Sequence, residues 1–140
     1  MARQLNAKIA EMTPDGLITD TQPRPNVRGG ILDVSELDPV PTVVPRGTLL
    51  GKKAEVDGKL HIWKDGGEIT PDCILCDDTP VEEGDKASGV AVVAYIAGCF
   101  DPNKIQCTEG KVTLEEGELD TLRMKGILFK AAVPIETAED

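Results

Sequence analysis

The residues best suited to chemistry are the two cysteines of the motif Cys73-x-x-Cys76. A CxxC pair can bind zinc or exchange thiols with disulfides. Zinc needs further ligands, and Cys99, Cys107 and His61 are the remaining cysteines and histidine of the chain. Cys99 and Cys107 are not spaced as a usual second ligand pair. A redox motif is expected at the start of a helix in a βαβ unit, which the sequence lacks. We therefore interpret both cysteines as small core residues, with a metal-binding or redox domain built on them as the alternative.

The single histidine, His61, is the only residue that could serve a Ser-His-Asp or Cys-His catalyst. The sequence directs no nucleophile at it, and its place in a strand pattern predicts an exposed or half-buried side chain. The adjacent acids Asp77-Asp78 and Glu82-Glu83 could form a cation site, but such pairs in a loop are usually solvated surface.

Two further motifs give no support to ligand chemistry. Gly29-Gly30 and Gly66-Gly67 lack the strand, loop and helix context of a phosphate-binding turn. Trp63 supplies at most one exposed aromatic side chain. A single aromatic side chain is too few for base stacking or for a peptide- or glycan-binding module. The sequence therefore predicts a protein that is not an enzyme and has no cofactor and no metal.

The element that must position all these residues is Gly89–Phe100, the longest apolar run in the chain. Its valines, isoleucine and tyrosine, bounded by Gly89 and Asp101-Pro102, favour a buried strand over a helix. It is far shorter than the ~20 residues of a membrane-spanning helix.

Shorter strands are expected around this run. The segments 48–56 and 59–64 are predicted to form a hairpin at Asp57-Gly58, with Gly58 left-handed and Ala54 paired with Leu60. The remaining strands are expected at 72–77, 105–108 and 127–133, with an acidic loop at 79–85 and a frayed end at 136–140.

One helix is expected, between Thr113 and Gly126. Thr113 and Glu116 have the spacing of a capping box, and Gly126 suits a left-handed stop. Gly117 weakens the first turn by ~1 kcal/mol, which favours a start one or two residues later. Together these elements predict a mainly β fold with one short C-terminal helix.

Residues 1–46 differ from the rest in composition. They contain six of the ten prolines, and short apolar pairs lie between these prolines. The pattern predicts an extended arm, residues 1–46, in front of a compact domain, residues 47–140; the arm can lie on its own body or add a strand to another subunit. The anchors are Leu17, Ile18, Ile31, Leu32, Val43 and Val44.

The charge is concentrated in the second part of the chain. The formal net charge is −10, of which residues 1–46 carry −1 and residues 47–140 carry −9. An acidic surface repels phosphate groups, so nucleic acid and anionic membranes are not expected as partners. The N-terminal residues lack the apolar stretch of a secretory signal, which predicts free thiols and synthesis in a reducing cytoplasm.

Several motifs in order are more specific than any one of them. The series comprises Thr13–Ile18, Arg46–Gly51, Cys73–Asp77, Val92–Asp101 and Leu122–Ile127. In order and spacing it resembles the head decoration protein D family of tailed bacteriophages over residues 13–133. It departs from the family at Cys73 and Cys76, where small or aliphatic residues are common, and its proline-rich arm is long.

The resemblance implies a β-clip or incomplete-barrel body with a short helix. It also implies a structural capsid decoration protein, made in the host bacterial cytoplasm, that binds as homotrimers to the outer surface of the virion. The expected partner is the major capsid protein at three-fold and quasi-three-fold positions of the expanded head. The N-terminal segment would pair with capsid strands, and the shell would be stabilised against the pressure of packaged DNA.

Overall fold

The computed structural model describes residues 16–37, 40, 42–53, 57–64, 68–107, 110–112 and 114–130. Its strands are β1 (Ile18–Asp20), β2 (Asn26–Asp33), β3 (Thr42–Val44), β4 (Leu49–Lys53), β5 (Leu60–Ile62), β6 (Ile69–Leu75), β7 (Thr79–Val81), β8 (Val90–Phe100), β9 (Gln106–Cys107), β10 (Gly110–Lys111) and β11 (Ile127–Phe129). The helices are α2 (Asp85–Ser88), the 3-10 helix η1 (Pro102–Lys104) and α3 (Glu116–Lys125). The predicted mainly β body with one short C-terminal helix is confirmed.

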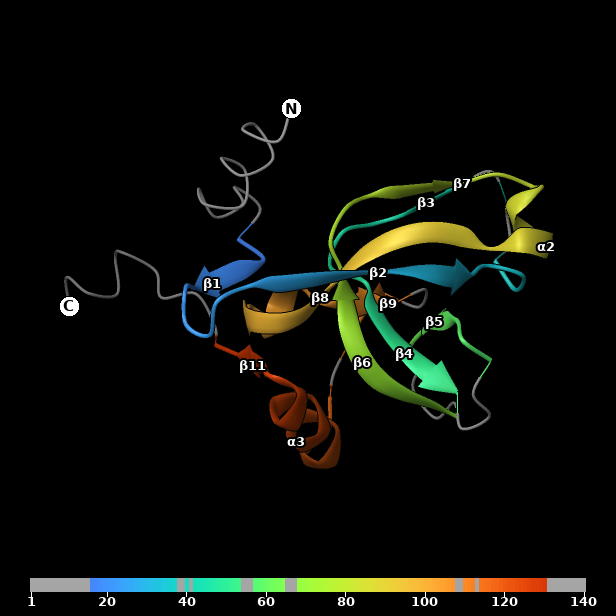
Figure 1. The fold of residues 1–140 in the computed structure, drawn as a ribbon. Helices are drawn as coiled ribbons and strands as arrows, with labels where there is room; N and C mark the ends of the chain where they lie inside the picture. Colours follow the sequence, from blue (N-terminus) through green and yellow to red (C-terminus); the bar gives the residue numbers. More distant parts are fainter. Residues whose placement is uncertain are drawn as a thin grey trace.

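The central strand is β8, as its apolar run predicts. It pairs antiparallel with β2, β6 and β1, and parallel with β11. The order β8-β2-β5-β4-β6 returns to β8, so these five strands close into a small barrel. The antiparallel ribbon of β3 and β7 lies on one side of this barrel, and α3 lies on the other (Figure 1).

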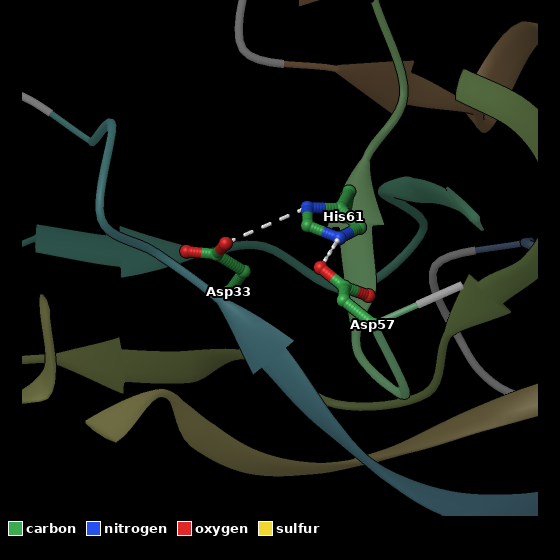
Figure 2. Close-up of side chains that lie close together, drawn as sticks. All are labelled: Asp33, Asp57 and His61. Atoms are coloured by element: carbon green, nitrogen blue, oxygen red, sulfur yellow. Dashed lines mark hydrogen bonds and ion pairs between the residues drawn. The ribbon is translucent and has the colours of Figure 1, made fainter. Parts of the chain in front are cut away.

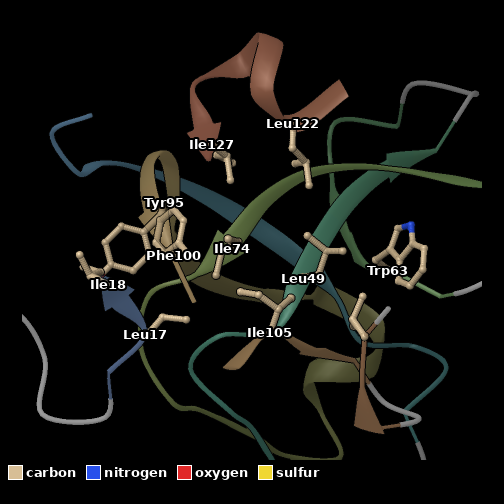
Figure 3. Close-up of a cluster of buried hydrophobic side chains, with 11 residues drawn as sticks. Leu17, Ile18, Leu49, Trp63, Ile74, Tyr95, Phe100, Ile105, Leu122 and Ile127 are labelled. Carbon is tan, nitrogen blue, oxygen red and sulfur yellow. The ribbon is translucent and has the colours of Figure 1, made fainter. Parts of the chain in front are cut away.

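Two apolar clusters hold the body together. The barrel cluster draws side chains from barrel strands and includes Leu32, Leu50, Cys73 and Ala94. The helix-side cluster lies between the sheet and α3 and is drawn in Figure 3. Its members are Leu17, Ile18, Leu49, Trp63, Ile74, Tyr95, Phe100, Ile105, Val112, Leu122 and Ile127. β8 contributes to both clusters because successive side chains of a strand point to opposite faces.

The hairpin of β4 and β5 forms with a different register. Gly58 has a φ of 76°, which confirms the left-handed turn residue. Leu50 pairs with Ile62, whereas the predicted register would place it opposite Lys64. The predicted partner Ala54 lies outside the described residues. The shift is by two residues, so each side chain keeps the face that the alternation gave it.

The helix α3 starts at Glu116, two residues later than a cap at Thr113 requires. Glu115 is the N-cap, and its side chain and that of Glu118 form the capping box. Gly126 is left-handed with a φ of 100°, and its N–H bonds to carbonyls of the last turn, so the predicted stop is confirmed. Thr113 and residues 131–140 lie outside the described residues.

The strand pairings place the described part of the predicted arm on this chain's own body, which is one of the two alternatives left open by the sequence. β2 pairs with β8 from Asn26 to Leu32 and is a barrel strand, and β1 pairs with the end of β8. β3 pairs with β7. From residue 16 onward the described part of the segment 1–46 is therefore built into the folded body. Prolines separate its short apolar stretches, and four of their six apolar residues are buried in this chain's own core: Leu17, Ile18, Leu32 and Val44.

Candidate functional site

His61 is buried, not exposed or half-buried as predicted, and it lies between two carboxylates (Figure 2). Its Nε2 lies 2.9 Å from Oδ2 of Asp57, and its Nδ1 lies 3.7 Å from Oδ2 of Asp33. Asp33 ends β2 and is the parallel pairing partner of His61 in β5. Asp57 belongs to the connection between β4 and β5. The pairing of β2 with β5, which sequence spacing does not reveal, brings these three residues together.

The carboxylates of this cluster favour their charged forms. The Ser35 backbone N–H, 2.9 Å from Oδ1 of Asp33, lowers the pKa of that carboxyl, and the nearby His61 adds to the effect. The Lys59 N–H, 3.0 Å from Oδ1 of Asp57, lowers the pKa of Asp57 in the same way, again with help from His61.

The chemistry available to this cluster is limited by its geometry. One histidine and two carboxylates are a donor set that a divalent cation can use, and the three groups lie within 4.8 Å of one another. The two carboxylates, however, face different nitrogens of the imidazole ring: Asp33 faces Nδ1 and Asp57 faces Nε2. The ring therefore lies between the two carboxylates. Among the described residues, no hydroxyl or thiol group forms a hydrogen bond with His61. Through these contacts, His61 connects β5 to β2 and to the turn between β4 and β5.

The CxxC pair does not form a joint site. Cys73 is buried in the barrel cluster, where burial raises the pKa of its thiol to about 12. Cys76 is half-buried against the helix-side cluster, and burial raises its pKa as well. Both zinc binding and thiol exchange need the thiolate, which a raised pKa disfavours. All four cysteines are free thiols, as predicted.

The other candidate motifs are mostly surface. Glu82 and Glu83 are exposed, as are Asp77 and Asp78. Oδ1 of Asp78 accepts a hydrogen bond of 2.7 Å from the Arg46 backbone N–H, so this acid has a structural partner.

One aromatic residue and two glycine pairs remain among the motifs noted in the sequence. Trp63 is buried in the helix-side cluster, which is consistent with the prediction of at most one exposed aromatic residue. Gly29-Gly30 lies within β2, and Gly66-Gly67 lies outside the described residues.

The six predicted contact residues are divided between core and surface. Four are buried in the two clusters and are core residues in this fold: Leu17, Ile18, Leu32 and Val44. Ile31 is 40% exposed and Val43 is 54% exposed, so these two remain available for contact with another protein. Neighbours differ in the pairs Ile31-Leu32 and Val43-Val44 because β2 and β3 alternate between a covered and an open face.

Ile31 belongs to an apolar surface that the sequence did not predict. β2 and β8 pair with Gly29 opposite Val93 and Ile31 opposite Ala91, and directly opposed residues of an antiparallel pair share a face. With Val27, which is 38% exposed, and Val93, which is 43% exposed, they form what we call the outer face: Val27, Gly29, Ile31, Ala91 and Val93. The alternate residues Val92 and Ala94 are buried in the barrel cluster. The run of β8 is apolar on both faces, so the sequence does not show which of its residues are buried and which are exposed.

No family model matches the chain, and no curated protein matches it significantly. Within the described residues, no helix has the length and apolar character needed to cross a membrane. The evidence for function thus comes from the motif series and from the surface of the body. An exposed apolar face on a sheet is a common feature of protein-protein interaction sites.

Proposed function

We propose that this protein is a structural capsid decoration protein of a tailed bacteriophage, which acts without catalysis. It binds as homotrimers to the major capsid protein on the outer surface of the expanded head, at three-fold and quasi-three-fold positions. There it stabilises the shell against the pressure of packaged DNA. The protein is made in the host cytoplasm, and neither nucleic acid nor a membrane is its partner.

The observation that carries this proposal is the outer face, which exposes valine and isoleucine side chains on a chain of net charge −10. A single exposed apolar side chain needs no explanation, but a contiguous group on paired strands favours a protein partner. Val43 on β3 adds a second exposed apolar position. The acidic charge elsewhere suits a surface that faces solvent and disfavours contact with the packaged DNA.

The motifs that resemble the decoration family also contact one another in this fold. Ile18 pairs with Phe100, and Ile127 pairs with Gly98. Arg46 donates hydrogen bonds to the carbonyl of Cys76 and the hydroxyl of Tyr95. The motifs of the series thus belong to one packed unit, which supports treating them as one pattern. Such packing concerns the fold, and the capsid role is our proposal.

Stoichiometry on capsids tests the proposal. Mature heads purified from the infected host should carry the chain at a fixed ratio to the major capsid protein, and immature heads should lack it. Sedimentation of the capsid-released protein would test the trimer. A chain missing from mature heads, or equally abundant on immature ones, would overturn the proposal.

Point substitutions test the surface. Ile31→Asp with Val93→Asp places charge on the outer face and should reduce binding to expanded heads by at least tenfold. Val43→Asp tests the second position separately. The matched control is Met124→Asp, which changes an apolar residue that is 89% exposed on α3 and should bind as the unaltered protein does. Removal of residues 1–46 is not informative, because it deletes β1, β2 and β3; removal of residues 1–15 tests the remaining arm.

A further inference from the structure

A cleft has a volume of about 230 Å³, and all five barrel strands contribute to its lining. Leu60, Ala94 and Ile96 give it an apolar part, and Gly30 lies beside Leu60. A Cβ on Gly30 would lie 2.9 Å from Cδ1 of Leu60, so only glycine keeps this space open without movement of Leu60. The cleft borders the outer face and shares Gly29 and Ile31 with it, but its lining also includes Cys73 and Ala94, which belong to the barrel cluster.

One wall of the cleft is a strand edge with open pairing positions. β2 pairs with β8 along one side from Asn26 to Leu32, but it pairs with β5 along the other side at Leu32 and Asp33 only. Within the described part of the chain, residues 26–31 therefore have no strand partner on the side of β5. In an antiparallel strand, alternate N–H and C=O groups point away from the existing partner. Gly29 and Gly30 lack side chains that would keep another backbone away.

The rim of the cleft is cationic on an acidic protein. Arg28, Lys52, Lys53 and Lys59 line it together with Asp57 and Asp72. Both acids already have partners. Asp72 lies 2.8 Å from Lys125 Nζ and 4.0 Å from Lys52 Nζ, and Asp57 contacts His61. An extended segment with acidic and apolar side chains matches this combination of open edge, apolar lining and cationic rim.

We propose that this cleft binds residues 131–140 of the same chain as an added strand beside β2. This segment, AAVPIETAED, contains Glu136, Glu139 and Asp140 and no basic residue. Residues 1–15 contain Arg3 and Lys8 as well as two acids, and so lack this charge match. Ile135 supplies an apolar side chain for the apolar lining, and the acidic residues that follow it suit the cationic rim. The proposal does not depend on the capsid role.

The chain has the length to reach the cleft. Its described part ends at Lys130, whose N–H bonds to the carbonyl of Phe100 at 2.9 Å. Phe100 lies four positions from Ile96 on β8, and β8 lines the cleft at Ile96. Those four positions span roughly 13 Å of strand, and the five residues from Lys130 to Ile135 span up to about 17 Å when extended. Lys125, five residues before Lys130, already contacts the rim at Asp72.

Backbone NMR of the full-length protein tests the proposal. Residues 135–138 should show ¹⁵N heteronuclear NOE values near those of β8, and the paired substitutions Lys52→Glu and Lys53→Glu should lower these values to those of a mobile chain. Lys64→Glu, at an exposed lysine that does not line the cleft, should leave them unchanged. A mobile segment in the unaltered protein would overturn the proposal, as would equal loss of order in the control.

Two further measurements distinguish docking within one chain from damage to the barrel and from docking between two copies. Glu136→Gln, Glu139→Gln and Asp140→Asn together leave the barrel untouched and should release the segment as the lysine substitutions do; a segment that stays ordered would overturn the proposal. Docking within one chain is independent of protein concentration. Ordering that disappears on tenfold dilution would instead show the segment of a second copy, and would overturn docking within the chain.

Discussion

Nη1 of Arg46 donates a hydrogen bond of 2.8 Å to the hydroxyl of Tyr95, and the guanidinium lies over the tyrosine ring with Cζ 5.4 Å from its centroid. The same nitrogen lies 2.6 Å from the carbonyl oxygen of Cys76. One side chain thus connects three segments that are far apart in the sequence. Burial raises the pKa of Tyr95 to about 12, so its hydroxyl stays protonated and can accept this bond.

Replacement of Arg46 should therefore destabilise the whole body. Arg46→Lys loses the planar group that reaches both acceptors, and we expect the free energy of unfolding to fall by about 1–3 kcal/mol. Urea denaturation followed by circular dichroism measures this. Arg123→Lys, on an exposed helix position, should change stability by less than ~0.5 kcal/mol. Equal effects of the two substitutions would contradict the connecting role of Arg46.

The neighbours Ile31 and Leu32 should respond in opposite ways. Leu32 is fully buried in the barrel cluster, so Leu32→Ala should lower the free energy of unfolding by about 2–5 kcal/mol. Ile31 is 40% exposed on the outer face, and Ile31→Ala should cost less than ~1 kcal/mol while weakening capsid binding. If both substitutions left the protein equally stable, β2 would not be the barrel strand described.

Gly47 should not tolerate a side chain. Its φ is 92°, and a Cβ would lie 2.9 Å from the Lys104 carbonyl oxygen. The Gly47 N–H and C=O also bond to Leu75 and Gln106. Gly47→Ala should lower the thermal midpoint, with a loss of about 1–3 kcal/mol. Gly84→Ala is the control, because Gly84 has a φ of −64° and its Cβ would meet no atom within 4 Å.

The cluster around His61 should make the free energy of unfolding depend on pH in the acidic range. The pKa values of Asp33 and Asp57 are lowered below 3.8, so their contribution is present above the unfolded-state pKa and is lost as pH falls through the folded-state values. The urea midpoint should therefore decrease below about pH 4. Asp33→Asn should be less stable near neutral pH and should show a smaller change on acidification. An unchanged pH profile in this variant would argue against the contribution of Asp33.

The cysteines should be unreactive and free of metal. With a pKa of about 12, Cys73 should react with a thiol reagent at pH 8 only when the protein unfolds. Elemental analysis of the purified protein should give far less than one zinc per chain. A stoichiometric metal that is lost in Cys73→Ala would revive the alternative function and contradict our interpretation of the pair as core residues.

Local chemistry in the sequence determined much of this fold. The β-branched run of β8, the turn at Gly58 and the stop at Gly126 depend on conformational preferences of a few neighbouring residues, and all three appear as predicted. α3 starts at Glu116, within the delay of one or two residues that Gly117 predicts. Its capping box is formed by Glu115 and Glu118, a pair with the same spacing as the predicted one, so spacing did not identify it.

The tertiary structure alone decided which face of each strand is covered. An apolar pair such as Ile31-Leu32 has the same pattern whether it contacts its own barrel or another subunit, so the sequence could not place Leu32 in the core and Ile31 on the outer face. His61 and Asp33 meet because β2 and β5 pair in parallel, and pairing between distant strands has no local signal. The sequence determined which segments become strands, and the closure of those strands around a common core determined which residues remain free to bind a partner.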